Sequence, residues 1–186
     1  MRIIGGKFKN RPLTSPKGTA VRPTSSRLRE TLFNICQQEI EGARFLDLFA
    51  GSGAMGIEAI SRGASFCVFS DKSRTSLQVI EKNINHLELG TQAQVLLGDA
   101  KKIIEQLNTR KAAFDLIFLD PPYNETTLVC EIMKEIDQTD LLINHGSLFL
   151  EEGGDFDPNT PFTNLTLSSR RKCGSTFLLH YKMERQ

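Results

Sequence analysis

The sequence predicts an α/β fold in which short buried strands alternate with helices. Residues 114–119 form an apolar run that is too short for a typical helix, and this run stops at Asp120-Pro121-Pro122. Residues 44–49 form a second such run, which leads into the glycine turn 51–56 and then a helical pattern. A strand, a glycine turn and a helix in this order are typical of a Rossmann-like nucleotide-binding domain.

The other elements continue this alternation. We expect a small hairpin at 3–13, helices at 25–38, 57–60, 74–87, 101–107 and 128–136, and strands at 44–49, 66–70, 94–97, 114–119, 147–151, 165–167 and 176–181. Too few residues separate the last two strands for a crossover helix, so this pair forms an antiparallel hairpin. The residues therefore predict seven strands, of which the last two form an antiparallel hairpin, with a small amino-terminal extension of hairpin and helix.

The composition is that of an ordinary globular domain, with 39% hydrophobic and 24% charged residues in a chain of 186. No apolar run approaches the roughly 20 residues that cross a bilayer, and the basic amino terminus lacks the apolar core of a signal peptide. We therefore expect a cytoplasmic monomer that binds no membrane. The four cysteines and three histidines are scattered singly along the chain, which predicts no metal site and no disulfide framework.

Charge is distributed unevenly along the chain. Residues 1–29 contain eight Lys and Arg residues and no Asp or Glu; since the whole chain carries +1 and this segment +8, the remainder carries −7. Such an asymmetry indicates an arm that meets phosphate. Ile3, Ile4, Phe8 and Leu13 are interleaved with the basic residues, which favours a folded arm over a solvated tail.

Basic residues in two places are the predicted contacts with RNA. The helix expected at 25–38 packs its apolar face on the domain and turns Arg22, Arg27 and Arg29 toward a ligand or RNA. Three further basic residues are expected at the tip of the terminal hairpin. The predicted RNA-binding residues are Arg2, Lys7, Lys9, Arg11, Arg22, Arg27, Arg170, Arg171 and Lys172.

The sequence Asp-Pro-Pro-Tyr at 120–123 is the predicted centre of the chemistry. It follows the carboxyl end of a strand, which is where open parallel α/β sheets bind ligands. The two prolines make this loop rigid, and the Asp120 carboxylate and the Pro121 carbonyl are both acceptors. Two acceptors beside the flat ring of Tyr123 suit a planar group with an –NH2, such as a nucleobase. A plain turn is the alternative interpretation.

Acidic residues end four of the predicted strands: Asp47, Asp71, Asp99 and Asp120. The pattern Gly51-x-Gly53-x-x-Gly56 also fits NAD formally, and Asp71 is placed to accept hydrogen bonds from ribose hydroxyls. This many carboxylates would repel a pyrophosphate but attract a sulfonium cofactor that has an amino group and no phosphate. The terminal antiparallel hairpin likewise fits a methyltransferase sheet better than a dehydrogenase sheet.

These motifs resemble those of a known family. Residues 47–56 (DLFAGSGAMG) resemble the cofactor motif of class I S-adenosylmethionine-dependent methyltransferases, and residues 120–123 resemble the Asp/Asn/Ser-Pro-Pro-aromatic motif of those that methylate an exocyclic or amide nitrogen. Residues 2–11 and 22–34 look like the amino-terminal signature of RsmD-type bacterial small-subunit ribosomal RNA guanine-N2 methyltransferases. The resemblance covers essentially the whole chain, although Asn10 stands where Gly is expected and Asp71 where Glu is more usual.

The resemblance implies a Rossmann-like class I methyltransferase fold, with a seven-stranded, mostly parallel sheet whose last strand is antiparallel. It also implies roles for individual residues. Gly51 and Gly53 would lie under the methionine part of S-adenosylmethionine, with Asp47 near its amine. Asp71 would hold the ribose hydroxyls, and Asp99 with the Ala100 N–H would read the adenine edge. The implied cofactor-binding set is Asp47, Phe49, Gly51, Ser52, Gly53, Gly56, Asp71, Lys72, Asp99 and Ala100; the implied catalytic set is Asp120, Pro121, Pro122 and Tyr123. The chain would divide into an RNA-facing extension, 1–42, and an S-adenosylmethionine-binding catalytic domain, 43–186.

The implied reaction is methylation of the exocyclic N2 of a guanosine in 16S ribosomal RNA, with an assembling small ribosomal subunit as the expected partner. The guanosine would flip out and stack on Tyr123, while Asp120 and the Pro121 carbonyl accept the two N2 hydrogens. Three alternatives stay open: an adenine-N6 or cytosine-N4 nucleic-acid methyltransferase, a protein glutamine-N5 methyltransferase, and, from another class, a nucleotide-binding non-enzyme or an NAD-binding oxidoreductase.

Overall fold

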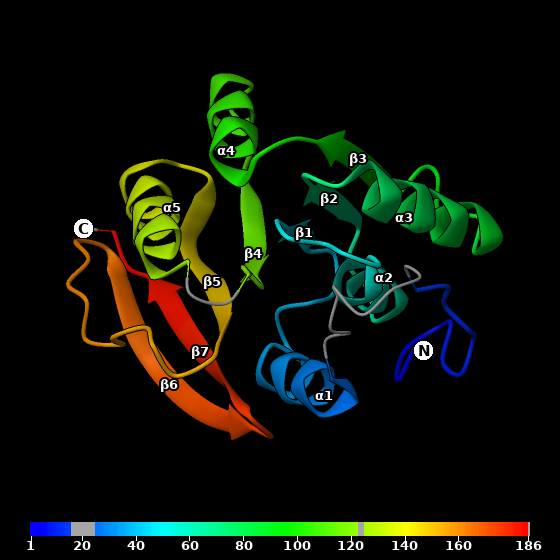
Figure 1. Ribbon diagram of the computed structural model, residues 1–186, viewed down its shortest axis with the longest axis horizontal. Coiled ribbons are helices and arrows are strands. Elements are labelled where there is room, and N and C mark those ends of the chain that lie inside the picture. Colours follow the sequence, from blue (N-terminus) through cyan, green and yellow to red (C-terminus); the bar gives the residue numbers. More distant parts are fainter. Residues whose placement is uncertain (16–24, 123–124, 186) are drawn as a thin grey trace.

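The computed structural model describes residues 1–15, 25–122 and 125–185, and one seven-stranded sheet forms its centre (Figure 1). The strand order is β3-β2-β1-β4-β5-β7-β6. The strands are β1 (Arg44–Asp47), β2 (Phe66–Asp71), β3 (Ala93–Leu97), β4 (Phe114–Leu119), β5 (Leu142–Glu152), β6 (Leu165–Cys173) and β7 (Thr176–Met183). Strands β1 to β5 are parallel, and β7 is antiparallel to both β5 and β6. The predicted fold class is confirmed.

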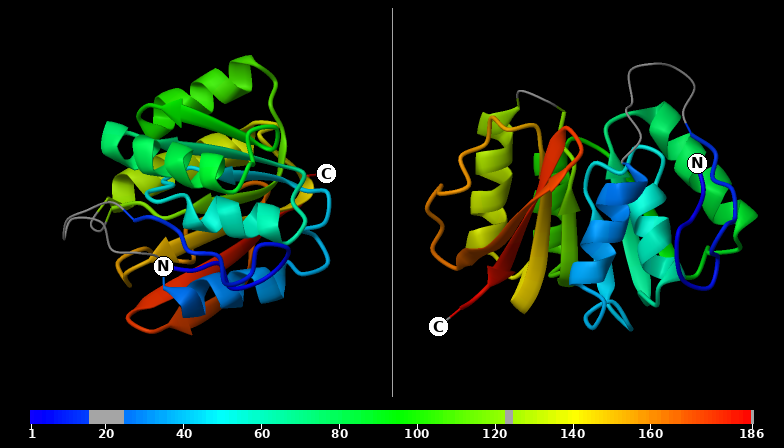
Figure 2. Two further views of the ribbon diagram at one scale, coloured as in Figure 1. Left: turned by 90° about the vertical axis from the view of Figure 1, so that its right-hand side faces the viewer. Right: turned by 90° about the horizontal axis from the view of Figure 1, so that it is seen from below.

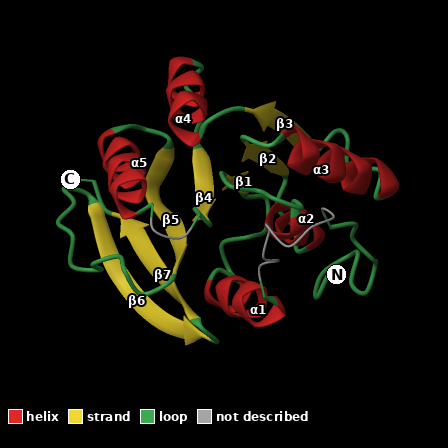
Figure 3. Ribbon diagram, in the orientation of Figure 1, coloured by secondary structure: helices red, strands yellow, loops and turns green. Residues whose placement is uncertain are grey.

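In the described part of the chain, five helices cover the two faces of the sheet (Figures 2 and 3). They are α1 (Ser26–Ile35), α2 (Ala54–Ser61), α3 (Arg74–His86), α4 (Ala100–Thr109) and α5 (Thr126–Gln138). Helices α1, α2 and α3 bury their apolar residues with one set of sheet side chains, and α4 and α5 bury theirs with the other set. No helix in the described ranges is long and apolar enough to span a membrane.

Successive side chains along the strands point alternately into these two cores. Phe45, Phe69, Phe118 and Phe149 belong to the core under α1, α2 and α3, whereas their chain neighbours Leu46, Ile117, Leu119, Leu148 and Leu150 belong to the core under α4 and α5. Because both faces are covered, the central strand β4 is apolar at every position except Asp115. This double burial explains why the sequence shows 114–119 as an apolar run with a single interruption.

The terminal hairpin differs from the prediction in the position of its turn. Strand β6 extends to Cys173, and the turn is made at Gly174 (φ +74) and Ser175, so residues 170–172 lie within the strand and not at the tip. The Arg170 guanidinium lies 3.9 Å from the centroid of the Phe177 ring and pairs with the Glu152 carboxylate at 3.1 Å. These contacts favour a continued ladder over a basic loop.

The amino-terminal segment forms a loop closed by one antiparallel bridge, Arg2 with Pro12, where a hairpin was expected. Backbone hydrogen bonds from Ile3 N to Arg11 O and from Leu13 N to Met1 O hold its two sides together. Asn10 has a φ of +69°, in the left-handed region that Gly favours and Asn tolerates better than most residues. The presence of Asn at a position where the family pattern has Gly is thus compatible with this turn.

The Glu58 carboxylate joins this loop to α1 and α2. It is fully buried and accepts hydrogen bonds from the backbone N–H groups of Ile4 (2.8 Å) and Gly5 (2.7 Å). It also pairs with Arg29 at 3.2 Å and with Arg62 at 2.8 Å. The expectation that Arg29 turns toward a ligand or RNA is therefore wrong: Arg29 is buried because its charge neutralises Glu58.

Removing the charge of Glu58 should destabilise the protein strongly. Glu58→Gln leaves the buried Arg29 charge without a counter-ion, which costs about 3 kcal/mol or more of unfolding free energy. Urea denaturation followed by circular dichroism measures this loss. The matched control is Glu81→Gln on the exposed face of α3, which should change the free energy by less than about 0.5 kcal/mol. A Glu58→Gln protein as stable as this control would contradict the anchoring role.

Candidate active site

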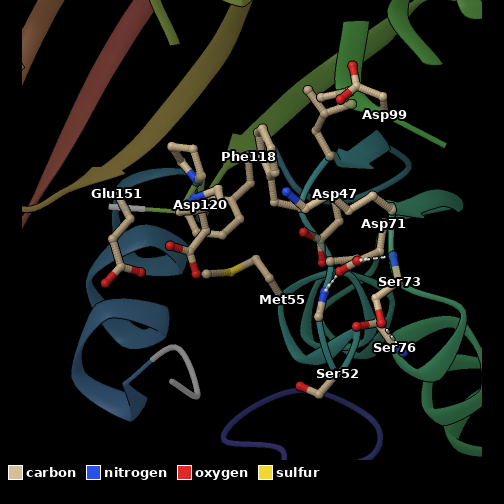
Figure 4. A pocket seen from close by; sticks show the side chains of 18 of the residues that line it. Asp47, Ser52, Met55, Asp71, Ser73, Ser76, Asp99, Phe118, Asp120 and Glu151 are labelled. Carbon is tan, nitrogen blue, oxygen red and sulfur yellow. Dashed lines mark hydrogen bonds between the residues drawn. The ribbon is translucent and has the colours of Figure 1, made fainter. Parts of the chain in front are cut away.

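A pocket of about 390 Å³ lies at the carboxyl ends of the parallel strands (Figure 4). Parallel strands bring their carboxyl ends to one edge of the sheet, so side chains far apart in the sequence meet there. The described residues that line the pocket are Asp47, Leu48, Phe49, Ala50, Gly51, Ser52, Ala54, Met55, Asp71, Lys72, Ser73, Ser76, Gly98, Asp99, Ala100, Phe118, Asp120, Pro121, Pro122, Leu128 and Glu151.

Two glycines allow the chain to turn sharply from β1 into α2. Gly51 and Gly53 have φ values of +53° and +76°, where a side chain would be strained. Gly56 serves packing instead, because a Cβ atom there would lie 2.3 Å from the Phe69 ring and 2.5 Å from the Cys67 sulfur. Gly51 lines the pocket, whereas Gly53 and Gly56 do not line it and instead allow the turn and its packing.

Asp71 is fixed by the backbone around it. One carboxylate oxygen accepts a hydrogen bond from Gly51 N at 2.9 Å, and the other accepts from Ser73 N at 2.8 Å. Each oxygen keeps a further lone pair, so the carboxylate can also accept from a diol such as the ribose hydroxyls. Asp99 caps the amino terminus of α4 by accepting from Lys101 N at 3.1 Å, which holds it beside Ala100 at the pocket wall.

Asp47 lies deeper than the other pocket acids and is only 1% exposed. Its carboxylate accepts a hydrogen bond from Gly56 N at 3.0 Å. Burial raises the pKa of Asp47 to about 7, and the nearby Asp71 charge adds to this rise. A ligand that brings a positive charge next to this buried carboxyl group would stabilise its ionised form.

Asp120 and Glu151 lie at the ends of neighbouring strands. Leu119 of β4 pairs with Leu150 of β5 in parallel register, so the next residue of each strand faces the same side of the sheet. Figure 4 shows both carboxylates pointing to the same side of the pocket. Pro121 and Pro122 line the wall beside them, and the predicted Tyr123 lies outside the described residues.

The structure gathers most of the predicted site residues in this one pocket. Of the predicted cofactor set, all but Gly53 and Gly56 line it, as do Asp120, Pro121 and Pro122. Glu151, Met55 and Phe118 were missed. The sequence did contain a signal for Glu151, since this residue ends the fifth predicted strand, 147–151, just as other acids end four of the predicted strands.

The basic residues predicted to bind RNA fall into two regions. Arg171 pairs with Leu178, and Leu178 pairs with Glu151, so Arg171 and Lys172 lie exposed at the pocket edge of the sheet. Arg27 is exposed on α1, which lies against β6 (Figure 1).

The amino-terminal loop lies farther from the pocket. Lys7 donates its backbone N–H to Ser61 O, which places this exposed lysine, and Lys9 beside it, at the end of α2 remote from the cofactor turn. Arg2 and Arg11 are also exposed on this loop. Arg22 lies outside the described residues.

The lining of the pocket suits a cationic ligand better than a pyrophosphate. Three carboxylates, those of Asp47, Asp71 and Asp99, lie along its cofactor side, and Lys72 is the single basic residue among the described residues that line it. A pyrophosphate would meet net repulsion here, whereas a ligand with a sulfonium and an ammonium group would be attracted. The residues present therefore fit S-adenosylmethionine.

Comparison with known proteins identifies the family. The profile of the family described as Conserved hypothetical protein 95 matches residues 1–182. The chain belongs to this family, that of the RsmD-type methyltransferases. Ribosomal RNA small subunit methyltransferase D of Escherichia coli K12 is 32% identical over 186 residues, which cover 100% of this chain and 91% of the relative. The Bacillus subtilis protein YlbH is 36% identical over 182 residues, which cover 98% of each chain.

Solved structures agree with this assignment. The structure of the Escherichia coli protein yhhF superposes with a TM-score of 0.87 at 32% identity and covers 100% of this chain and 99% of the other. The RNA methyltransferase from Salinibacter ruber, solved with S-adenosyl-L-homocysteine, is 12% identical with a TM-score of 0.68 and shows the shared fold. The RsmD-type chain is thus a class I methyltransferase in fold as well as in sequence.

Binding of S-adenosylhomocysteine should release protons through Asp47. With a pKa of about 7, Asp47 is about half protonated near neutral pH, and an ammonium group placed beside it favours the ionised form. The pKa of Asp47 then falls on binding, so up to about half a proton leaves at pH 7, and this release fades as the pH rises above about 8.5.

Calorimetric titration at pH 7 in buffers of different ionisation enthalpy measures this release. The control is Asp47→Asn, which keeps an oxygen to accept the Gly56 N–H and should lose the release. Equal proton release by both proteins would show that Asp47 does not face the ligand's amine.

Proposed function

We propose that this RsmD-type enzyme transfers the methyl group of S-adenosylmethionine to the exocyclic N2 of a guanosine in small-subunit ribosomal RNA. The enzyme is an S-adenosylmethionine-dependent RNA methyltransferase by family. The observation that supports the finer assignment is the pair of acceptors, the Asp120 carboxylate and the Pro121 carbonyl, in the pocket that also holds the acid-lined cofactor site. Its relatives include enzymes named for the small ribosomal subunit.

S-adenosylmethionine supplies a methyl group that its sulfonium already activates. In the proposed arrangement Asp47 faces the amine of the methionine part, where its burial makes a positive partner most favourable. Asp71 accepts from the ribose hydroxyls, and Asp99 with Ala100 N–H binds the adenine edge. The glycine turn allows the backbone at Gly51 to approach the ligand closely.

The target guanine enters beside Asp120. Its N2 amine donates one hydrogen to the Asp120 carboxylate and the other to the Pro121 carbonyl, which aims the nitrogen lone pair at the methyl carbon. The N2 lone pair forms the new N–C bond while the electron pair of the C–S bond stays with sulfur. One N2 proton then leaves, to Asp120 or to water. Positioning supplies most of the rate enhancement because the methyl group needs no further activation.

Nucleoside analysis tests this function. The protein is incubated with radiolabelled S-adenosylmethionine and with small-subunit RNA, free or in partly assembled particles, from cells that lack the protein. The RNA is then digested and its nucleosides are separated. Label in N2-methylguanosine is the expected result, and a preference for particles over free RNA would support an assembling subunit as the substrate. Label in N6-methyladenosine or N4-methylcytidine would overturn the base assignment.

Asp120→Ala should lower the rate of methyl transfer by at least about 100-fold, which corresponds to about 3 kcal/mol of transition-state stabilisation by an oriented charged acceptor. Affinity for S-adenosylhomocysteine should change little, because the cofactor side of the pocket is intact. Single-turnover transfer and a thermal-shift titration measure the two quantities. A rate within tenfold of the wild-type rate would remove Asp120 from the mechanism.

Charge reversal at the exposed pair Arg171 and Lys172 should weaken RNA binding and flatten its salt dependence. Each lost phosphate contact lowers the slope of log affinity against log salt by about 1. Filter binding from 50 to 300 mM salt measures the slope for Arg171→Glu/Lys172→Glu. Lys134→Glu, on the exposed face of α5, is the control. An unchanged slope in the double variant would mean that this basic strand is solvated surface only.

A further inference from the structure

We infer that Glu151 determines the base specificity of the enzyme by accepting the N1–H of guanine, next to the amine that Asp120 orients. This inference rests on the proposed function, since it concerns the base that is methylated there. It makes Glu151 a second carboxylate for the substrate, distinct from the three that face the cofactor.

The sheet places Glu151 beside Asp120. The pairs Phe118 with Phe149 and Leu119 with Leu150 fix the register of β4 and β5, so Asp120 and Glu151 occupy equivalent positions on adjacent strands. Adjacent strands are about 4.8 Å apart, and side chains at equivalent positions of parallel strands point to the same face. Both carboxylates accordingly line the same pocket (Figure 4).

Glu151 differs from the next residue along its strand. Glu152 points to the opposite face, where its carboxylate pairs with Arg170 at 3.1 Å. Glu151 is 7% exposed and lines the main pocket, which Glu152 does not. Its carboxylate oxygens are acceptors only, so the Glu151 side chain presents to this pocket a group that suits an N–H donor of a ligand.

Guanine has the donor that this arrangement requires. Its exocyclic N2 and its ring N1 are neighbours on one edge of the base, and both carry hydrogens. When the N2 amine donates a hydrogen bond to Asp120, the N1–H faces the adjacent strand β5 and donates a charge-assisted hydrogen bond to Glu151.

Adenine and cytosine would meet a mismatch at Glu151. Each has an exocyclic amine that could donate a hydrogen bond to Asp120. The adjacent ring nitrogen, N1 of adenine or N3 of cytosine, carries a lone pair and no hydrogen. That lone pair would face the carboxylate, so that two acceptors meet, and a site that recognises a base through its N–H strongly rejects an analogue without that hydrogen. Glu151 thus separates the guanine-N2 activity from the two other nucleobase activities that share the Asp-Pro-Pro-Tyr motif.

Base analogues test this role without changing the reacting amine. 2-Aminopurine keeps the exocyclic amine of guanine at C2, but its N1 has no hydrogen. Synthetic RNAs that carry guanosine or 2-aminopurine riboside at the methylated position are compared by kcat/KM for label transfer from S-adenosylmethionine. The wild-type enzyme should prefer guanosine by at least about 100-fold. Glu151→Gln, whose amide can donate to an N1 lone pair, should reduce this preference to below tenfold.

Glu105→Gln, at an exposed position of α4, is the matched control and should keep the wild-type preference. Because each preference is a ratio measured with one protein, a general loss of folding or a difference in the intrinsic reactivity of the two amines cancels when proteins are compared. If Glu151→Gln is inactive on both RNAs, Glu151→Asp replaces it: a retained guanosine preference supports the role of the carboxylate, and equal rates contradict it.

Two further outcomes would overturn the inference. One is equal kcat/KM of the wild-type enzyme for both RNAs, and the other is a preference in Glu151→Gln as large as that of the wild type. Both leave guanosine methylation intact, so they are distinguishable from failure of the proposed function, in which the wild-type enzyme labels no guanosine.

Discussion

Parallel strands turn alternate side chains to the same face, and in this sheet that constraint gathers carboxylates at one edge. Strands β1, β2, β4 and β5 all carry a phenylalanine two residues before an acid: Phe45 and Asp47, Phe69 and Asp71, Phe118 and Asp120, Phe149 and Glu151. The phenylalanines are buried in the core under α1, α2 and α3. Each acid must therefore point to the same face, just beyond the edge of that core, where the pocket lies.

The register of the strands places these four acids at different depths and beside different parts of the pocket. Asp47 pairs with Phe69 and with Phe118, so it lies one pleat deeper than Asp71 and Asp120, and this depth is what raises its pKa. Asp47 and Asp71 border the glycine turn and suit the cationic cofactor. Asp120 and Glu151 border the rigid prolines and suit the donors of a base. In the proposed function, the order of strands in the sheet thus places the two reactants side by side in one pocket.

The sequence was sufficient to predict most of the fold because both faces of the sheet are buried and a central strand such as β4 is apolar at nearly every position. It also predicted most of the residues that meet in one pocket, since glycine turns and strand-end acids lie at the carboxyl ends of parallel strands, where such folds bind ligands. Arg29 was misassigned because its partner, Glu58, is 29 residues away and only the packing of α1 on α2 brings them together. The basic triplet was misplaced because its strand continues through contacts with Phe177 and Glu152. Pairing across strands likewise concealed the relation of Glu151 to Asp120.

The central claim is that one edge of the sheet binds the cofactor and the target base through separate carboxylates. A crystal structure of the protein with S-adenosylhomocysteine and guanosine tests it most directly. The account predicts ribose hydroxyls within hydrogen-bonding distance of Asp71, and a guanine whose N2 lies within hydrogen-bonding distance of Asp120 and points at the sulfur. A cofactor that leaves Asp71 uncontacted, or a guanine bound away from Asp120 and Glu151, would contradict it.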